Sequence, residues 1–206
     1  MTRFAVILIA LVTLVACTAP NETVTGPPED LGDFRLGHNI VVAPDFQKGP
    51  VSREGNKEEF IASMKKAIDT RFGRYDGTRL VHFGVNLSGY ALAPPGLPLL
   101  FSPKSALIIT VTAWDDRAGG KFNQEPREII VLESFTGGSL VGSGYTLSPE
   151  EQMNNLTYNA TREIEEWMHK NRACLVDDVP AETLANCWKT TKAERQERQQ
   201  QLDELR

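Results

Sequence analysis

Histidine and cysteine are scarce in this chain, and neither is spaced as a metal site requires. Only three histidines and three cysteines occur among 206 residues, without the short spacing of a zinc or iron ligand set. The sequence therefore predicts no metal and no cofactor. An excess of basic charge is also lacking, since 22 Lys and Arg residues stand against 27 Asp and Glu residues. This balance disfavours a nucleic-acid partner, because phosphate contacts need clustered positive charge.

Signatures of catalysis are missing as well. The glycine-rich stretch at 137–144 contains no Gly-Lys-Ser/Thr of a phosphate-binding loop and no Gly-x-Ser-x-Gly nucleophile turn. His82 lies in a predicted strand and His169 near the end of a predicted helix. Neither has a serine or cysteine partner nearby in the sequence, so we expect structural roles and predict no catalytic residue. A hydrolase whose site is assembled only in space stays an alternative.

A long apolar run occurs only at the N-terminus. One basic residue, Arg3, precedes an uncharged apolar run from Phe4 to Val15. A membrane span needs about 20 such residues, so this run is too short for one. The layout is that of a secretory signal, and residues 1–16 are predicted to be a signal peptide.

The run closes with Leu14-Val15-Ala16-Cys17, which resembles the lipobox of bacterial lipoproteins. The resemblance implies cleavage before Cys17, a diacylglyceryl group on the Cys17 sulfur and acylation of the new amino group. Several acyl chains, palmitate among them, would hold the protein on a lipid bilayer almost permanently. Thr18 stands where the family's inner-membrane retention signal has aspartate. We therefore expect the periplasmic face of the outer membrane, with the inner membrane as the alternative.

The remaining chain divides by composition into three segments. Residues 17–36 are polar and rich in Pro and Gly, which predicts a lipidated flexible tether. Residues 37–171 carry the periodic apolar patterns of a folded domain, and residues 172–206 form a C-terminal extension. In an exported protein Cys174 and Cys187 are expected to pair, and a disulfide across this loop would stabilise by about 3 kcal/mol. Two free buried thiols are the alternative.

The apolar patterns of 37–171 alternate between strand and helix. Strands are predicted at 39–43, 80–87, 105–114 and 127–135, and helices are predicted to begin after Asn56 and Ser148. Asn56 precedes a glutamate by three residues, and Ser148-Pro149-Glu150-Glu151 has the residues of a capping box with proline at the first helical position. The expected fold is one α+β domain, a mainly antiparallel sheet of about four strands with two main helices on one face, followed by a C-terminal helical extension.

The segment from Glu133 through Gly144 and Ser148 to Ala160 resembles uncharacterised small lipoproteins of Gram-negative bacteria. The order of elements is similar to that of compact α+β lipoprotein domains that activate cell-wall synthases or serve secretion and transport machines. The resemblance implies a similar fold for most of residues 37–170, and fold-level analogy does not assign a function.

A predicted loop at 91–103 is unusually apolar and holds four prolines. Its side chains Leu97, Leu99, Leu100 and Phe101 are predicted to bind a partner, since a stiff loop loses little entropy on docking. Folding back over the core is the alternative. The sequence thus favours a non-enzymatic envelope lipoprotein that acts as a protein-interaction or assembly module with an envelope protein. The alternatives are a carrier or sensor of a small apolar or lipid ligand, and the hydrolase.

Overall fold

The computed structural model of this chain describes residues 24, 26–94, 105–133 and 147–204. The strands are β1 (Phe34–Val42), β2 (Gln47–Lys48), β3 (Arg79–Ala91), β4 (Ala106–Asp115), β5 (Gly120–Lys121) and β6 (Arg127–Leu132). The helices are α1 (Lys57–Phe72), α3 (Pro149–Lys170), the short 3-10 helix η2 (Arg172–Cys174), α4 (Ala181–Leu184) and α5 (Lys192–Glu204).

All described strands belong to one sheet, in which β1 lies beside β3 and β3 beside β4, while β4 also pairs with β5 and β6. The pairs β3–β4, β4–β5 and β4–β6 are antiparallel. The expected mainly antiparallel α+β fold is confirmed. The β1–β3 pair is parallel, which the sequence patterns did not indicate, and α1 supplies the crossover that a parallel pair requires.

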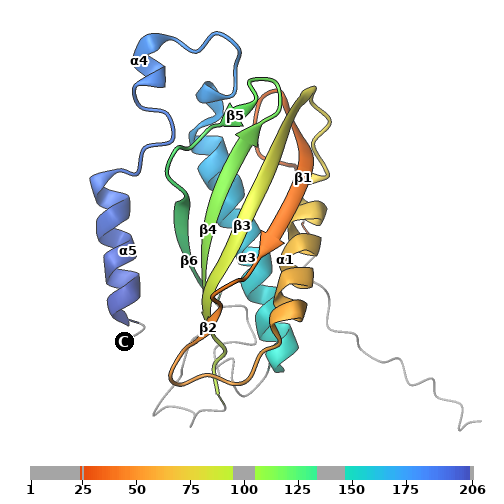
Figure 1. Cartoon of the computed structure of the whole chain (residues 1–206), viewed down its shortest axis with the longest axis vertical. Helices are drawn as coiled ribbons and strands as arrows, with labels where there is room; N and C mark the ends of the chain where they lie inside the picture. The colour runs from red at the N-terminus through yellow and green to blue at the C-terminus, as the bar shows by residue number, and fades with distance from the viewer. Residues whose placement is uncertain (1–23, 25, 95–104, 134–146, 205–206) are drawn as a thin grey trace, which may run out of the picture.

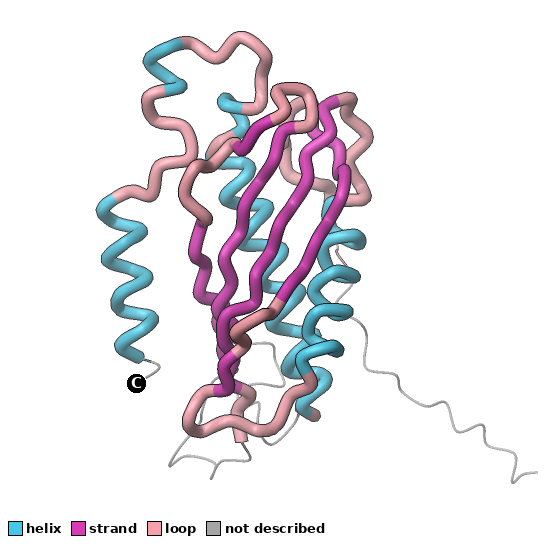
Figure 2. Tube along the Cα trace, in the orientation of Figure 1, coloured by secondary structure: helices cyan, strands magenta, loops and turns pink. Residues whose placement is uncertain are grey.

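Helices α1 and α3 lie side by side behind the sheet and cover the same face (Figures 1 and 2). The expected arrangement of two main helices on one face is therefore confirmed. Alternate residues of the strands point into this layer and are fully buried, as the period of two predicts. The core side chains of the two central strands are Val81, Phe83, Val85, Leu87, Leu107, Ile109, Val111 and Ala113.

The two helix starts follow from their capping residues. The Asn56 side chain accepts a hydrogen bond from the backbone N–H of Glu59 at 3.1 Å. Ser148 and Glu151 form a reciprocal capping box, with Pro149 at the first helical turn. These bonds satisfy N–H groups that have no partner inside the helix, and so they fix where α1 and α3 begin.

The folded domain begins earlier than position 37, so the predicted tether boundary at 36 is wrong. Leu31 and Phe34 are each only 1% exposed, and β1 starts at Phe34. The Phe34 ring packs against Phe72 and Phe83, with centroid separations of 5.7 and 6.0 Å. A single aromatic residue within a polar stretch gives no periodic signal, and its burial comes from contacts distant in the sequence.

The C-terminal extension is held to the sheet edge by charge. Helix α5 lies alongside β6 (Figure 1). Arg127 of β6 contacts Glu194 at 3.2 Å, and Arg198 of α5 contacts Glu128 at 3.4 Å. The predicted helical tail is present, and ion pairs position it because its sequence has too few apolar residues for a packed face.

Candidate functional site

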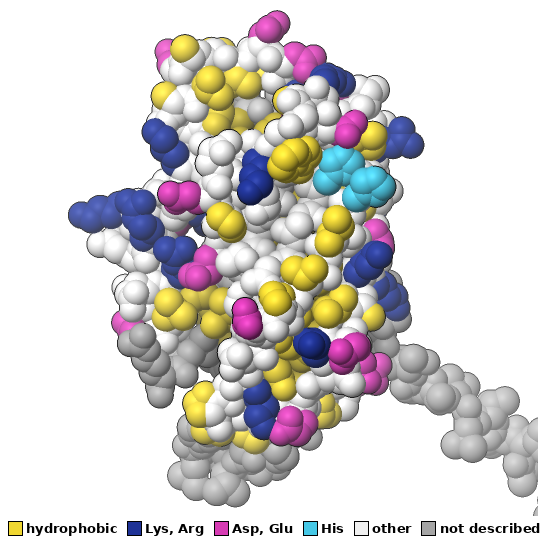
Figure 3. All heavy atoms as spheres, viewed as in Figure 1, with side chains coloured by type: hydrophobic (Ala, Val, Ile, Leu, Met, Phe, Trp, Pro, Cys, Tyr) yellow, Lys and Arg dark blue, Asp and Glu magenta, His cyan; other side chains and the backbone are white. Residues whose placement is uncertain are grey.

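The side of the sheet opposite the two helices is not covered by any helix among the described residues (Figure 1). We call it the open face. Figure 3 views this side and shows hydrophobic and histidine side chains gathered over the strands. Its outward-pointing residues on β1, β3 and β4 include Arg35, His38, Ile40, Val42, Leu80, His82, Gly84, Asn86, Thr110, Thr112 and Trp114.

Apolar side chains are concentrated on the open face. Four of the seven large hydrophobic side chains exposed in the described part of the chain lie here: Ile40 (61%), Val42 (46%), Leu80 (36%) and Trp114 (40%). Among these residues only Arg35 is charged, and it lies at the end of the face, beside Leu80. Charged neighbours in the strand register, Lys121 and Glu128, stand at its margin. Exposed apolar side chains together with uncharged polar ones, with charges at the margin, are a composition found at protein–protein interfaces.

Gly84 occupies the middle of the open face, between Ile40 of β1 and Thr112 of β4. A Cβ atom built on Gly84 would meet only the Thr112 carbonyl oxygen, at 3.9 Å. Nothing among the described residues therefore requires glycine at this position, although glycine weakens the interior of a strand. The space above Gly84 is therefore open, and we call this space the gap at Gly84. A strand glycine of this kind is typical of a place where another molecule's backbone approaches closely.

The histidines of this face lie at one end of it. The rings of His38 and His82 are stacked, with centroids 5.0 Å apart and planes 17° apart. The backbone N–H of His38 donates to His82 Nδ1 at 2.7 Å, while His82 Nε2 lies 3.3 Å from Asp116 Oδ1. Trp114 stands directly opposite His82 in the register of β3 and β4. Among the described residues, His82 is hydrogen-bonded to the His38 N–H and lies against Asp116, and neither partner is a hydroxyl or thiol nucleophile.

The other predicted site residues have different outcomes. Cys17 and the loop residues Leu97, Leu99, Leu100 and Phe101 lie outside the described residues, as does the 137–144 glycine stretch. Lipidation and the partner-binding loop therefore stay predictions. His169 Nδ1–H donates to the Asp30 carbonyl at 2.8 Å, and the ring lies beside Arg172, so His169 ties the N-terminal segment to the end of α3.

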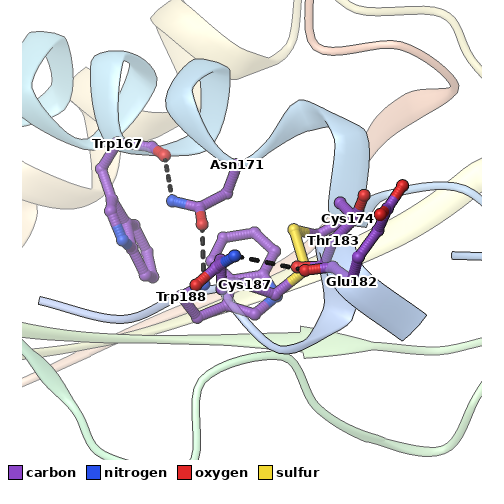
Figure 4. The surroundings of a disulfide bond; sticks show 8 residues. Trp167, Asn171, Cys174, Glu182, Thr183, Cys187 and Trp188 are labelled. Carbon is purple, nitrogen blue, oxygen red and sulfur yellow. Dashed lines mark hydrogen bonds between the residues drawn. A yellow bond between two sulfur atoms is a disulfide. The ribbon is translucent and has the colours of Figure 1, made fainter. Parts of the chain in front are cut away.

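Cys174 and Cys187 form the expected disulfide, with Cα atoms 5.9 Å apart (Figure 4). Asn171 holds the segment beside it: its side-chain amide donates to the Trp167 carbonyl at 2.8 Å and accepts from Trp188 N–H at 2.7 Å. The Trp188 ring packs edge-on against Trp167, with centroids 5.2 Å apart. The disulfide thus anchors the start of the C-terminal extension to the end of α3.

Two buried ion pairs join elements of the core. Arg71 of α1 binds Glu165 of α3 at 2.7 Å, and Arg79 binds Asp115 across β3 and β4 at 2.8 Å. Tyr75 also donates to Glu165, and burial together with this hydrogen bond raises the pKa of the Tyr75 phenol. All these charges have partners in the fold, and breaking such a pair leaves a buried charge uncompensated. We interpret both pairs as structural.

A polar cavity of about 260 Å³ lies between β6, α3 and α5. Its arginines, Arg127 and Arg198, already pair with glutamates. Burial and the neighbouring Glu166 raise the pKa of the Glu163 carboxyl, which also lines the cavity. Because its arginines are already engaged, this cavity offers no clear ligand chemistry.

Neither a metal site nor a membrane span emerges from the described residues. No three His, Cys, Asp or Glu side chains among them are grouped so that they would hold a metal ion. None of the helices placed by the structure is long and apolar enough to cross a bilayer.

The sequence analysis did not identify the open face. The run Leu80–Leu87 is predicted as a strand, without a distinction between its two faces. The available signal was Gly84, a glycine inside a strongly β-forming run.

Comparisons with known proteins give limited information. No family model and no curated protein matches this chain. Similar solved structures include a candidate lipoprotein of Caulobacter crescentus, with 11% identity, a TM-score of 0.35 and coverage of 65% of this chain and 94% of that one. A Xanthomonas campestris protein of family DUF330 has 11% identity, a TM-score of 0.36 and coverage of 74% and 94%.

A minor lipoprotein of Acinetobacter baumannii has 14% identity, a TM-score of 0.28 and coverage of 62% and 94%. Two of these three similar structures are thus described as lipoproteins, and all three come from Gram-negative bacteria. At these TM-scores the likeness carries no argument about function.

Proposed function

We propose that this chain is a non-enzymatic lipoprotein of the bacterial envelope whose open face binds a protein partner. Acylated Cys17 anchors it to the periplasmic face of a membrane. We propose the outer membrane, because Thr18 stands where the inner-membrane retention signal has aspartate. The anchor rests on the lipobox Leu14-Val15-Ala16-Cys17 and on the apolar run before it. The disulfide between Cys174 and Cys187 agrees with an oxidising compartment outside the cytosol.

The observation that carries the binding function is Gly84 within an exposed, partly apolar surface whose neighbouring charges, Arg35, Lys121 and Glu128, lie at its end and margin. Exposed Ile40 and Trp114 supply contact area on either side of the gap at Gly84. The side chains of Asn86, Thr110 and Thr112 have amide and hydroxyl groups that can form hydrogen bonds with a bound protein. A protein surface fits this chemistry best, because a nucleic acid or an anionic lipid headgroup would require basic residues at the centre.

The two alternative functions gain less support. A carrier of an apolar ligand needs space between sheet and helices, and large side chains fill that space: Phe34, Phe60, Phe72, Phe83 and Leu107 are each at most 1% exposed. A hydrolase needs an activated nucleophile, and the contacts of His82 and His169 supply none.

The binding function is tested by a photo-cross-linking amino acid placed at Thr112 of the full chain in intact cells. We expect one adduct of discrete mass at Thr112 and none when the same probe stands at Lys66, an exposed position of α1. Adding Gly84→Thr to the Thr112 probe should abolish the adduct, since the new side chain fills the gap. Stability should stay unchanged or rise by up to about 1 kcal/mol.

Ala62→Thr, which adds similar bulk on an exposed turn of α1, serves as the matched control and should leave the adduct intact. An adduct that persists in Gly84→Thr, or equal adducts at Thr112 and Lys66, would contradict binding at the open face. The anchor is tested separately, because labelled palmitate should enter the wild-type chain and not Cys17→Ser.

A further inference from the structure

The edge strand β1 contains an irregularity that is closed by a histidine side chain. The pairing of β1 with β3 shifts register between Leu36 and Asn39, so that Gly37 and His38 form a bulge. In the bulge the His38 N–H turns to the His82 imidazole and donates to Nδ1 at 2.7 Å. The ring takes the place of a backbone acceptor at this point of the sheet.

The bulge is packed directly onto this ring. A Cβ atom on Gly37 would collide with His82 Nδ1 and Cε1, so only glycine allows the approach. The His38 ring stacks on the His82 ring, and the two ring planes are 17° apart. Small changes at the imidazole are therefore transmitted to the backbone of β1.

The hydrogen bond from His38 N–H determines which ring nitrogen of neutral His82 carries the proton. Because Nδ1 accepts from His38 N–H, the neutral ring carries its proton on Nε2, which faces Asp116 Oδ1 at 3.3 Å. A second proton can bind only at Nδ1. Two donors, Nδ1–H and the His38 N–H, would then face each other, and the bond that closes the bulge would be lost.

We infer that protonation of His82 opens the β1 bulge and so makes the open face sensitive to pH. Histidine changes charge between about pH 5 and 8. The titratable groups that face the ring are Asp116, on the turn after β4, and His38, on β1. The sheet register places two further charges near this end of the face, Arg35 beside Leu80 and Lys121 beside Trp114.

The consequence for binding rests on the proposed function. Ile40 follows the bulge by two residues, and Trp114 lies opposite His82. When the bulge opens, the side chains of β1 move relative to those of β3 and β4, and the gap at Gly84 changes shape. Partner binding should therefore weaken at mildly acidic pH.

The structural step is tested without a partner, in the full chain carrying Cys17→Ser so that it stays unacylated. Amide hydrogen exchange at His38, corrected for the intrinsic effect of pH, should speed up roughly tenfold between about pH 7.5 and 5.5 as one hydrogen bond is lost. The ring nitrogen shifts of His82 should show an unprotonated Nδ1 at the higher pH.

His82→Asn is the informative variant, because its amide oxygen supplies an acceptor near the position of Nδ1 and does not titrate. We expect the same His38 protection at both pH values in this variant, and the wild-type change in His169→Asn. The inference is overturned if His82 gains its proton while His38 protection stays constant, or if His82 stays neutral down to about pH 5. Both outcomes are read from the Cys17→Ser chain that retains His82, so a His82 variant that fails to fold does not remove the test.

Binding is then compared at the two pH values through the Thr112 probe. The adduct yield should fall at pH 5.5 in the wild-type chain, and its ratio between the two pH values should be constant in His82→Asn. An absent adduct at both pH values would contradict the proposed function and leave the His38 result standing. If the adduct yield does not change with pH while the exchange of the His38 amide does, only the claim that pH regulates partner binding is overturned.

Discussion

The two faces of the sheet are built by the same strands and have opposite physical demands. On β3, Val81, Phe83 and Val85 point toward the helices and are at most 1% exposed, while the alternate residues Leu80 and Gly84 point outward. Core packing restricts every side chain of the covered face in size and polarity. The open face has no such restriction, so its exposed apolar residues and its glycine need a reason other than the fold.

The largest expected loss of stability comes from a substitution on the covered face. Phe83→Ala removes a ring that packs against Phe72, with centroids 4.9 Å apart, and against Phe34. Unfolding in urea should show a loss of about 3–5 kcal/mol, because a cavity remains where the ring was. A loss below about 1 kcal/mol would mean that the layer between sheet and helices is not packed as described.

A smaller effect tests how far the covered layer extends along the chain. Replacing both Cys174 and Cys187 by serine frees the segment that carries Trp188, which packs on Trp167. The free energy of unfolding should fall by about 3 kcal/mol for a loop of this length. Reduction of the wild-type chain should lower its stability to the same value, and titration of two free thiols before reduction would refute the disulfide.

The smallest expected change in stability comes from a substitution on the open face. It is compared with the same substitution at the next residue of β3, which lies on the covered face. Leu80→Ala should change stability by no more than about 0.5 kcal/mol, since its side chain is already 36% exposed. Val81→Ala, one residue later, should cost several times more, because two buried methyl groups are lost at about 0.8 kcal/mol each. Equal melting temperatures for the two variants would contradict the assignment of the faces.

Local signals in the sequence predicted the elements of this fold well. Asn56 and Ser148 marked the helix starts because capping depends on residues within one turn. The pairing of Cys174 with Cys187 was also predictable, since they are the only cysteines beyond the apolar N-terminal run. The parallel pairing of β1 with β3 was not, because strand order depends on long-range contacts that no local pattern encodes.

The candidate site was harder to predict for a related reason. Leu80 and Val81 are both apolar, so the alternation that separates an inner from an outer face is obscured at the start of β3. His82 gave no sequence signal of its hydrogen bond, because its donor is a backbone group in a bulge of another strand. The burial of Phe34 was missed for the same reason, since its partners Phe72 and Phe83 are far along the chain.

The parallel pairing of β1 also has a consequence during synthesis of the chain. Strand β1 is completed before α1 and β3 exist, and at roughly 5–20 residues per second its partner follows some seconds later. Residues 36–42 contain no charge and no proline that would protect an unpaired strand from self-association. During this interval β1 has no strand partner, and its pairing has to wait until β3 has been made.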